Sequence, residues 1–427
     1  MKVLVIGGGG REHAIIAAVS RSPKVEKIFA APGNAGIAAL AECVAIKDTD
    51  VDALVTFAYN NKVDLTIVGP EASLALGIVD AFEAHGLKIF GPKKAAAQVE
   101  VSKDWAKNVM AKYGVPTARF QTFSDYGEAL EYIHKEGAPI VLKYDGLAAG
   151  KGVVVAETMA EAEAALKDML LDEEFGKGSV VIEECLRGTE FSFMCLVDGK
   201  NVLPLPIAKD HKRAYDGDKG PNTGGMGAVS PVSLIPNSEV EWSYNNIMCR
   251  MAEAMVSEGC PFSGLLYGGL MLTKDGVKVI EFNARFGDPE AMNVLTLLDS
   301  DFVTIAEHIV SGTLTPADVS FRKQATVCKY IVPKNYPEHP HAGDPITLGP
   351  HENTILYYAN VMEEDGVLKT QTSRTIAFVG VGATLTEAEK AAESACRSVS
   401  GNVRHRTDIG TEALFAKRIA HMKELRG

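Results

Sequence analysis

The sequence has no excess of positive charge. Its 43 lysine and arginine residues are outnumbered by 55 aspartate and glutamate residues, which gives a formal net charge of -12 and a pI near 5.4. Proteins that bind nucleic acids or anionic membranes gain much of their affinity from a positive field. The charge balance therefore argues against both classes of partner.

Long apolar segments and paired cysteines are also lacking. No stretch approaches the roughly eighteen apolar residues of a membrane span, and the apolar start at 3–6 is too short for a signal-peptide core. The seven cysteines are odd in number, lie far apart and include no CxxC pair for zinc or redox chemistry. We therefore expect a soluble, cytoplasmic protein whose cysteines are reduced and mostly buried.

The length of 427 residues and a hydrophobic content of 46% allow about three domains. The first hundred residues alternate expected strands and helices, an order that predicts a parallel sheet with ligands at the carboxyl ends of its strands. The expected strands lie at 3–6, 27–30, 65–68 and 89–91, and the helices start near Glu12 and span 51–61. A polar stretch at 99–103 predicts a hinge into a second domain.

Antiparallel strands are expected in the middle of the chain. The β-branched runs at 140–142, 153–155 and 180–182 flank a helix that the capping box of Thr158 and Glu161 predicts. Two dipeptides between apolar runs, Asp198-Gly199 and Asp275-Gly276, predict hairpin turns. In the last hundred residues we expect strands at 325–332, 355–361 and 375–381, and a helix after a second capping box, Thr386 with Glu389.

A tetraglycine loop at 7–10 follows the first expected strand and precedes a helix. Gly7 and Gly9 could begin a dinucleotide fingerprint, but Glu12 stands where the third glycine belongs. No acidic residue ends the second strand to hold a ribose. Three interpretations stay open: NAD binding, phosphate binding at the helix N-terminus, and a plain tight turn.

A second glycine-rich loop, at 143–152, carries a lysine at each end. It is not a Walker A loop, because only three residues separate Gly146 from Gly150 and no serine or threonine follows Lys151. Bare backbone between Lys143 and Lys151 suits a flap over a polyphosphate. A mobile surface hairpin with solvated lysines is the alternative.

The expected strand at 277–283 gives the strongest indication of metal chemistry. Its period of two places Glu281 and Asn283 on the same face. Such oxygen ligands suit Mg²⁺, which takes one or two protein oxygens while phosphates and water complete its shell. The alternative is an edge strand that runs into a solvated turn. The charged residues that follow are Arg285, Asp288 and Glu290.

The loop at 216–227 is a further candidate, since it follows a charged run at 210–213. Its backbone amides and mixed charges could hold a small zwitterion and a phosphate, whereas the alternative is a flexible linker. His211 could act as an acid or a base, although a histidine in a charged run is more often solvated.

Several short motifs occur along the chain in an order that is more specific than any one of them. They lie at 9–13, 32–36, 69–71, 145–153 and 221–227, with Arg-Phe-Gly-Asp-Pro-Glu at 285–290. Over essentially its whole length the chain resembles the phosphoribosylamine-glycine ligase family, or glycinamide ribonucleotide synthetases, of the ATP-grasp superfamily. It departs from the usual family pattern at Ser73, Thr189, Lys209 and Met292, and around 330–337.

The resemblance implies a fold that is α/β plus α+β. Its parts would be a βαβ domain at 1–102, a two-lobed ATP-grasp domain at 103–324 with a flexible lobe at about 115–192, and a small carboxyl-terminal α+β domain at 325–427. The resemblance also implies a monomer or weak homodimer.

The site residues are carried over in the same way. ATP would contact Lys103, Lys143, Gly150 and Lys151, with adenine along Glu183, Glu184 and Leu186 and the ribose at Glu190. Mg²⁺ or Mn²⁺ would bind Glu281 and Asn283. The substrate residues would be Gly9, Asn34, Gly36, Glu71, Asp210, Lys212, Asn222, Gly224, Gly225, Met226, Gly227 and Arg285. Among all of these, Arg285, Lys151 and Asp210 would be catalytic.

The implied reaction joins glycine to 5-phospho-β-D-ribosylamine, an early step of purine synthesis. A carboxylate is a poor electrophile, so the γ-phosphoryl group of ATP would first pass to glycine, and the amine would then attack the glycyl phosphate. Catalysis would rest on positioning and charge neutralisation. The alternatives are another ATP-grasp carboxylate-amine ligase and a non-catalytic ATP-binding sensor.

Overall fold

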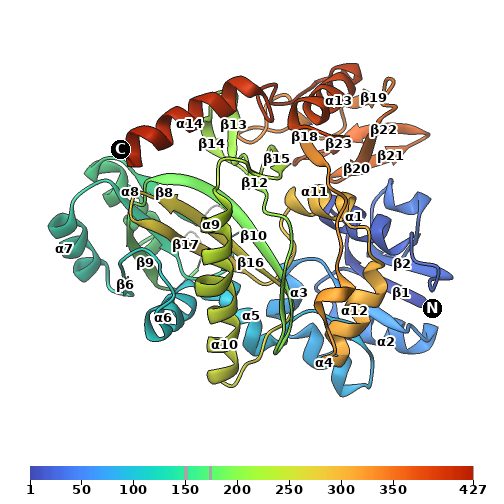
Figure 1. Cartoon of the computed structure of the whole chain (residues 1–427), viewed down its shortest axis with the longest axis horizontal. Coiled ribbons are helices and arrows are strands. Elements are labelled where there is room, and N and C mark those ends of the chain that lie inside the picture. Colours follow the sequence, from blue (N-terminus) through green and yellow to red (C-terminus); the bar gives the residue numbers. More distant parts are fainter. Residues whose placement is uncertain (149–151, 173–175, 427) are drawn as a thin grey trace.

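The computed structural model describes residues 1–148, 152–172 and 176–426 (Figure 1). These residues form a parallel sheet at the N-terminus, two antiparallel sheets in the middle and a C-terminal group of antiparallel sheets. The mixed α/β fold class is therefore confirmed. Among the described residues, no helix is long and apolar enough to cross a membrane.

The N-terminal sheet has the strand order β3-β2-β1-β4-β5, and every pairing is parallel. Its strands are β1 (Lys2–Gly7), β2 (Lys27–Pro32), β3 (Glu42–Cys43), β4 (Leu65–Val68) and β5 (Ile89–Phe90). The helices around them are α1 (Gly10–Val19), η1 (Ile37–Ala39), α2 (Val51–Asn61), α3 (Glu71–Ala75), α4 (Ile78–Ala84) and α5 (Lys94–Val101). Residues 3–6 of β1 are all apolar because both faces of the strand are covered: Val3 and Val5 join one core cluster, and Leu4 and Ile6 join another.

At 99–103, where the sequence predicts a hinge, a single residue separates two helices. Helix α5 ends at Val101, and α6 (Lys103–Tyr113) starts after Ser102, whose hydroxyl accepts a hydrogen bond from the Trp105 amide at 3.1 Å. Serine is a good N-cap, so the chain can change direction here and start a new helix at once.

A small antiparallel sheet with its own core follows. Its strand order is β6-β9-β7-β8. It contains β6 (Phe120–Phe123), α7 (Tyr126–Glu136), β7 (Ile140–Tyr144), β8 (Val153–Ala156), α8 (Met159–Leu170) and β9 (Val180–Glu184). The predicted capping box of Thr158 and Glu161 is present at the start of α8.

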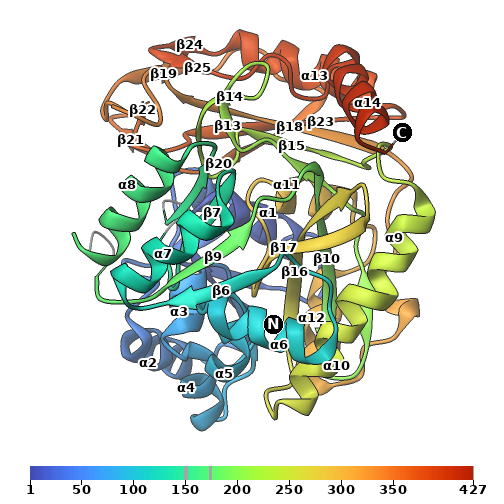
Figure 2. The ribbon, with the colours of Figure 1, turned by 90° about the vertical axis from the view of Figure 1, so that its left-hand side faces the viewer.

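A larger antiparallel sheet, in the order β11-β10-β16-β17, lies beside the small one (Figure 2). Its strands are β10 (Gly188–Asp198), β11 (Val202–Pro204), β16 (Ser263–Thr273) and β17 (Gly276–Asn283). The neighbouring elements are a hairpin of β13 (Arg213–Tyr215) and β14 (Lys219–Asn222), and α9 (Asn237–Ser243), η2 (Tyr244–Cys249), α10 (Arg250–Ser257), α11 (Glu290–Leu297), α12 (Phe302–Ser311) and η3 (Pro316–Asp318). Both predicted hairpins form, each one residue away from the predicted dipeptide. The first turns at Gly199 and Lys200, because the Asp198 amide bonds to the Asn201 carbonyl. The second turns at Lys274 and Asp275, because Thr273 pairs with Gly276.

The C-terminal strands share a sheet with strands from the middle of the chain. This sheet runs β12-β15-β18-β23-β20, with β25 paired to β18. The elements are β12 (Lys209–Asp210), β15 (Gly227–Ser230), β18 (Ala325–Pro333), β20 (Thr354–Tyr358), β23 (Ile376–Gly382) and β25 (Val403–Arg404). A second sheet, β21-β22-β19-β24, contains β19 (Pro345–Thr347), β21 (Val361–Glu364), β22 (Val367–Thr370) and β24 (Ser400–Gly401). The helices are α13 (Leu385–Ser398) and α14 (Glu412–Arg426). Helix α14 extends away from α13 towards the left edge of Figure 1, and its Arg418 pairs with Asp218, between β13 and β14, at 3.0 Å.

Two expectations for this region were wrong. The strand expected at 355–361 is divided between β20 and β21, which belong to different sheets. The N-cap of α13 is Thr384 rather than Thr386, and its hydroxyl accepts from the Glu387 amide at 3.2 Å. The sequence contains Thr-x-x-Glu in both registers, and only packing of the helix on the sheet decides between them.

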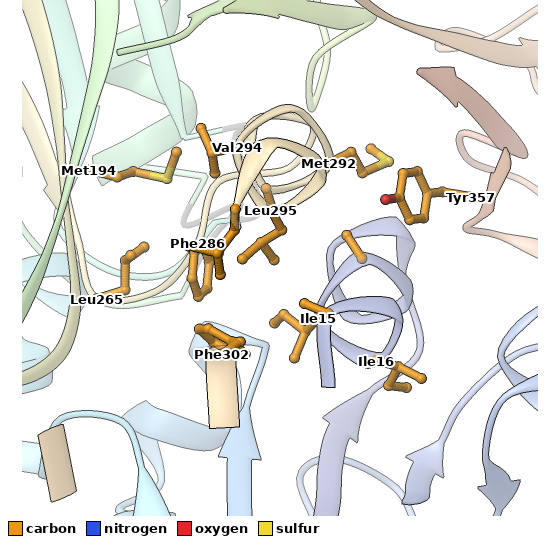
Figure 3. Close-up of a cluster of buried hydrophobic side chains, with 14 of the residues drawn as sticks. Ile15, Ile16, Met194, Leu265, Phe286, Met292, Val294, Leu295, Phe302 and Tyr357 are labelled. Atoms are coloured by element: carbon orange, nitrogen blue, oxygen red, sulfur yellow. The ribbon is translucent and has the colours of Figure 1, made fainter. Parts of the chain in front are cut away.

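One core cluster joins all three parts of the chain (Figure 3). Ile15 and Ile16 of α1, Leu295 of α11, Phe302 of α12 and Tyr357 of β20 belong to it, and each is buried. Phe302 makes edge contacts with Phe90 and Phe286, at ring-centroid distances of 6.0 and 5.9 Å. This cluster fixes the sheets relative to one another.

Replacing Phe302 by alanine should lower the free energy of unfolding by about 3–5 kcal/mol, because the cavity left behind is closed on all sides. Urea titration followed by circular dichroism measures it. Tyr59→Ala, at a side chain that is 66% exposed, is the control and should change stability by less than about 0.5 kcal/mol. A loss below about 1 kcal/mol for Phe302→Ala would contradict the assignment of this cluster as the common core.

His13 links the first helix to the C-terminal part. Its Nδ1 accepts a hydrogen bond from the Tyr358 amide at 2.9 Å, and burial lowers its pKa from 6.5 to about 4. Because protonation is easier in the unfolded chain, the stability that this group contributes is intact above pH 6.5 and is lost as the pH falls through 4. We expect a loss of about 3 kcal/mol from this group over that window, and His13→Asn should remove that share of the pH dependence. Urea unfolding at pH 7, 5.5 and 4 tests this; equal pH slopes for the two proteins would refute it.

Candidate functional site

A cavity of about 870 Å³ lies between the small and the large antiparallel sheets, a size typical of sites for small molecules. Apolar side chains from both sheets, among them Val141, Val155 and Met271, line one part of it. The rest is lined by charged residues from α6, β9, β12 and β17, and by the start of α11. The cavity therefore offers an apolar slot next to a strongly polar region.

Two lysines and Glu183 form a buried ion cluster at the junction of the sheets. Glu183 of β9 lies 2.8 Å from Lys107 Nζ and 2.9 Å from Lys143 Nζ, and all three side chains are less than 5% exposed. Lys143 also donates to the carbonyl of Ile280 in β17 at 3.0 Å. An ammonium group has three protons, and the bond to Ile280 uses one of them. Burial lowers the pKa of Lys107 to about 8.

The other residues predicted for the nucleotide are placed as follows. Lys103 Nζ donates to the carbonyl of Gly146 at 2.9 Å, at the start of the second glycine loop. Glu184, Leu186 and Glu190 line the cavity, and Glu184 is paired with Arg119 and Lys278, both at 3.1 Å. Gly150 and Lys151 lie outside the described residues.

Glu281 and Asn283 both face the cavity from β17, while Phe282 between them is buried. Burial raises the pKa of Glu281, but the charges of Lys212, Lys143 and Lys103 outweigh burial and lower it below its usual value. Asn283 donates its amide nitrogen to Glu100 at 3.2 Å, which leaves its Oδ1 as a potential ligand. A charged carboxylate and an amide oxygen fit a hard divalent cation that also binds phosphates. Among the described residues no cluster of three or more histidine, cysteine or acidic side chains could hold a metal alone.

Arg285 is held by two carboxylates. Its Nε lies 3.2 Å from Glu71 and its NH2 lies 2.8 Å from Glu100. Glu71 was predicted to bind substrate, yet here it anchors Arg285 and also lies 3.7 Å from Arg11. Burial raises the pKa of Glu71, but the charges of Arg285 and Arg11 outweigh it, and the pKa falls to about 2.

Glu100 is a site residue that the sequence reasoning missed. Besides its bonds to Asn283 and Arg285, its Oε2 accepts from the Ala284 amide at 2.7 Å. The available signal was weak: an acidic residue on the helix face that also carries Ala96, Ala97 and Val99, all of them buried.

The substrate residues predicted at 210–227 are only partly brought together. Asp210, Lys212, Asn222 and Gly224 line the cavity. The side chain of Met226 is fully buried in the core, and a Cβ on Gly227 would lie 2.2 Å from the Cys328 carbonyl. Gly225 packs against Asp210 in the same way. Met226 and Gly227 therefore do not line this cavity. Gly227 begins β15, which pairs with β18, and the carbonyl of Met226 accepts from the Tyr330 amide of β18 at 2.9 Å, so both residues are held in the core.

A second cavity, of about 370 Å³, lies between the tetraglycine loop and the C-terminal part. Gly9 and Asn34 line it, whereas Gly36 packs on the ring of Tyr358 and does not. The Asn34 side chain is used within the protein: it donates to Gly8 and accepts from the Gly36 amide, both at 2.9 Å. Asn34 therefore shapes the wall of the second cavity through bonds within the protein.

The tetraglycine loop carries its own carboxylate. Glu12 Oε2 accepts from the Gly9 amide at 2.7 Å, at the N-terminus of α1. A Cβ on Gly7 or Gly69 would lie within 3 Å of Glu12. The glycines thus make room for Glu12, which disfavours the dinucleotide interpretation of this loop.

Asp288 and Arg374 line both cavities. Arg374 NH1 lies 3.2 Å from Asp288 Oδ1 and donates to the carbonyl of Gly225 at 3.0 Å, and its guanidinium stacks 4.5 Å over the ring of Tyr330. Tyr330, in the segment that departs from the family pattern, donates to Asp288 at 2.7 Å. This group joins the two cavities.

Two antiparallel sheets that enclose an apolar slot, a buried lysine cluster and a carboxylate-amide pair on one strand define an ATP-grasp protein. Family comparisons narrow this class. The phosphoribosylglycinamide synthetase N domain matches residues 1–100, the ATP-grasp (A) domain 101–291 and the C domain 326–412. The chain belongs to the phosphoribosylglycinamide synthetase family.

Individual relatives agree with this assignment. The chain is 52% identical to the phosphoribosylamine-glycine ligase of Methanocorpusculum labreanum, with 100% of both chains covered. The crystal structure of the phosphoribosylamine-glycine ligase of Thermotoga maritima matches with a TM-score of 0.84 and 33% identity, over 96% of this chain and 100% of that one. The biotin carboxylase domain of 2-oxoglutarate carboxylase from Hydrogenobacter thermophilus, at 17% identity and a TM-score of 0.74 over 95% and 91% of the chains, shares the fold.

Glu100→Ala should destabilise the protein by about 3–5 kcal/mol, because it removes the partner of the buried Ala284 amide and the more deeply buried of the two carboxylates that hold Arg285. Glu71→Ala should have a smaller effect, since the Glu71 side chain is 33% exposed and that of Glu100 only 5%. Urea unfolding of both variants at pH 7 compares them. Equal losses, or a larger loss for Glu71→Ala, would contradict this ranking.

Proposed function

We propose that this protein ligates glycine to 5-phospho-β-D-ribosylamine at the expense of ATP, through glycyl phosphate, in purine biosynthesis. One observation carries the proposal. Glu281 and Asn283, which would bind the cation, and Arg285, which would bind the carboxylate, lie within five residues of one another and line one cavity. A triphosphate and a carboxylate can therefore meet there. The similarity of the chain, over its full length, to phosphoribosylamine-glycine ligases supports the choice of substrates.

For the nucleotide, we place adenine in the apolar slot beside Glu184 and Leu186, and the ribose near Glu190. Lys103 and Lys143 approach the phosphates, and Lys151 would do so from the second glycine loop. Charge-assisted hydrogen bonds of this kind contribute roughly 1.5–3 kcal/mol each. Glu281 and Asn283 would hold Mg²⁺, or Mn²⁺, which would neutralise phosphate charge.

For the acid, Arg285 would align the glycine carboxylate with the γ-phosphate. Its ion pairs with Glu71 and Glu100 hold the guanidinium still, so little reorganisation is needed when the carboxylate attacks the phosphorus. The leaving group in the second step is inorganic phosphate. No protein nucleophile is required, and the enclosed site limits hydrolysis of the acyl phosphate.

For the amine, we place the phosphate of phosphoribosylamine in the second cavity, against the backbone of Gly8 and Gly10 and the side chain of Ser373. Its amine would then reach the acyl carbon past Asp288 and Arg374, the residues common to both cavities.

We further propose a cytoplasmic location, a monomer or weak homodimer, and the division into domains at 102 and 324 given above. The seven cysteines are all free, which fits a reducing compartment. The short Ser102 break between α5 and α6 fits the first boundary.

Phosphate release from Mg-ATP should require glycine and phosphoribosylamine together, and Glu281→Ala should reduce it about a hundredfold or more, because the charge on the triphosphate is no longer matched. A coupled phosphate assay measures this. The control is Glu26→Ala, at an exposed carboxylate, which should retain full activity.

Two outcomes would redirect the proposal. Equal turnover with another acid or another amine would indicate a different ATP-grasp ligase. Tight ATP binding without any phosphate release would indicate the sensor.

A further inference from the structure

We propose that Asp288 takes the proton that the amine loses in the second step of the reaction, and that Tyr330 is a positioning residue that holds Asp288 for this role. The inference rests on the function proposed above and assigns two residues within it. It starts from the wall between the two cavities, where the amine would meet the acyl carbon.

Only two of the described residues, Asp288 and Arg374, line both the large and the second cavity. A guanidinium group has donors but no acceptor and keeps its proton in proteins, so Arg374 cannot take a proton from a substrate. A carboxylate can. Within the described chain, Asp288 is therefore the side chain at the common wall that can accept the proton of an amine entering from the second cavity.

One oxygen of the Asp288 carboxylate is fixed by the C-terminal part of the chain. Oδ1 accepts from the hydroxyl of Tyr330 at 2.7 Å and lies 3.2 Å from Arg374 NH1. The same NH1 donates to the backbone carbonyl of Asp288 at 3.1 Å. Backbone and side chain of this residue are thus both held in place.

The other oxygen of Asp288 keeps acceptor capacity. Among the described residues, Oδ2 has one hydrogen-bond donor, the Arg11 amide, at the long distance of 3.4 Å. A Cβ on Gly9 would lie 3.8 Å from Oδ2, and Gly9 lines the second cavity. Because a carboxylate oxygen can accept two hydrogen bonds, Oδ2 has room for a substrate N–H on the side of the tetraglycine loop.

Tyr330 of β18 is built into the core for this contact. The residue is fully buried, and within the described chain its hydroxyl has Asp288 as its one hydrogen-bond partner. Burial and the negative charge of Asp288 raise the pKa of Tyr330 well above its usual value, so the hydroxyl stays protonated and donates. A Cβ on Gly10 would collide with this hydroxyl, so the tetraglycine loop leaves space for it.

The second step of the reaction releases one proton. The lone pair of the amine nitrogen forms the bond to the acyl carbon, and the bond from that carbon to the phosphate oxygen breaks, so its electron pair leaves with inorganic phosphate. The nitrogen carries two hydrogens before the step and one after it. Oδ2 of Asp288 takes the released proton and passes it on to phosphate or water. A base positioned in this way commonly contributes roughly 10²–10⁴-fold to the rate.

The test separates the two steps in the full-length protein. Hydroxylamine reacts with acyl phosphates in water without a catalyst, so it reports glycyl phosphate as glycine hydroxamate. Asp288→Asn keeps the shape and can still accept from Tyr330. We expect it to lower kcat/KM for phosphoribosylamine about a hundredfold or more, while hydroxamate formation and the KM for ATP change by less than about twofold.

Tyr330→Phe is an independent variant that leaves Asp288 charged. It should lower kcat/KM for phosphoribosylamine about tenfold and leave hydroxamate formation unchanged, because only the orientation of the base is lost. The matched control is Tyr357→Phe, which removes another buried phenol hydroxyl, bonded to Thr296 at 2.9 Å in the common core. It should keep both activities.

A purely structural role would lower both products by the same factor in Asp288→Asn and Tyr330→Phe, and that result would overturn the inference. So would an unchanged kcat/KM for phosphoribosylamine in Asp288→Asn, or equal losses in Tyr330→Phe and Tyr357→Phe. Failure of the proposed function would look different, because the wild type itself would form neither the hydroxamate nor the ribonucleotide.

Discussion

The carboxylate of Glu100 holds three consecutive residues of the site. It accepts from the side chain of Asn283, the amide of Ala284 and the guanidinium of Arg285, and it lies almost fully out of water. Hydrogen bonds to a charged group are stronger than neutral ones, and the low local dielectric increases that strength. One buried group on α5 therefore sets the amide orientation of the cation-binding residue and the direction of the anion-binding residue. The separation between the places where a metal and a carboxylate can bind follows from this constraint.

Some charged groups of the large cavity have partners of opposite charge within the protein, and others do not. Lys107 and Lys143 both pair with Glu183, and Arg285 pairs with both Glu71 and Glu100, so each of these charges has a partner of opposite sign. Buried ions are tolerated in such groups because each has a partner and further hydrogen bonds. Asp210 lacks that compensation, because its Oδ1 is buried without a hydrogen-bond partner. A buried charged group without a partner in the protein is stabilised when a ligand supplies that partner. Such groups are therefore candidates for contacts with substrate.

The shared core explains how residues from three parts of the chain can act at one site. The cluster drawn in Figure 3 joins α1, α11, α12 and β20, and strands β12 and β15 lie in the same sheet as β18 and β23. Arg374 and Tyr330 are therefore held against Asp288, at the wall common to both cavities. A close-packed core of this kind fixes the relative positions of the elements, because displacement of one element would create voids or steric overlaps with the others.

Local patterns were enough to predict much of this protein. The alternation of β17 put Glu281 and Asn283 on one face, Thr158 and Glu161 announced α8, and the ordered motifs indicated the family; each depends on residues a few positions apart. Glu100 and Arg374 could not be found in this way, because their partners lie far away in the sequence and only strand pairing and helix packing bring them together. The burial of Met226 was decided likewise by its hydrogen bond to Tyr330 of β18, next to the pairing of β15 with β18.

Sequence by itself determined the types of element and the chemistry they carry, since both follow from local spacing. Tertiary structure alone decided which charges are satisfied and which remain for a ligand, because compensation of a charge depends on distances across the fold.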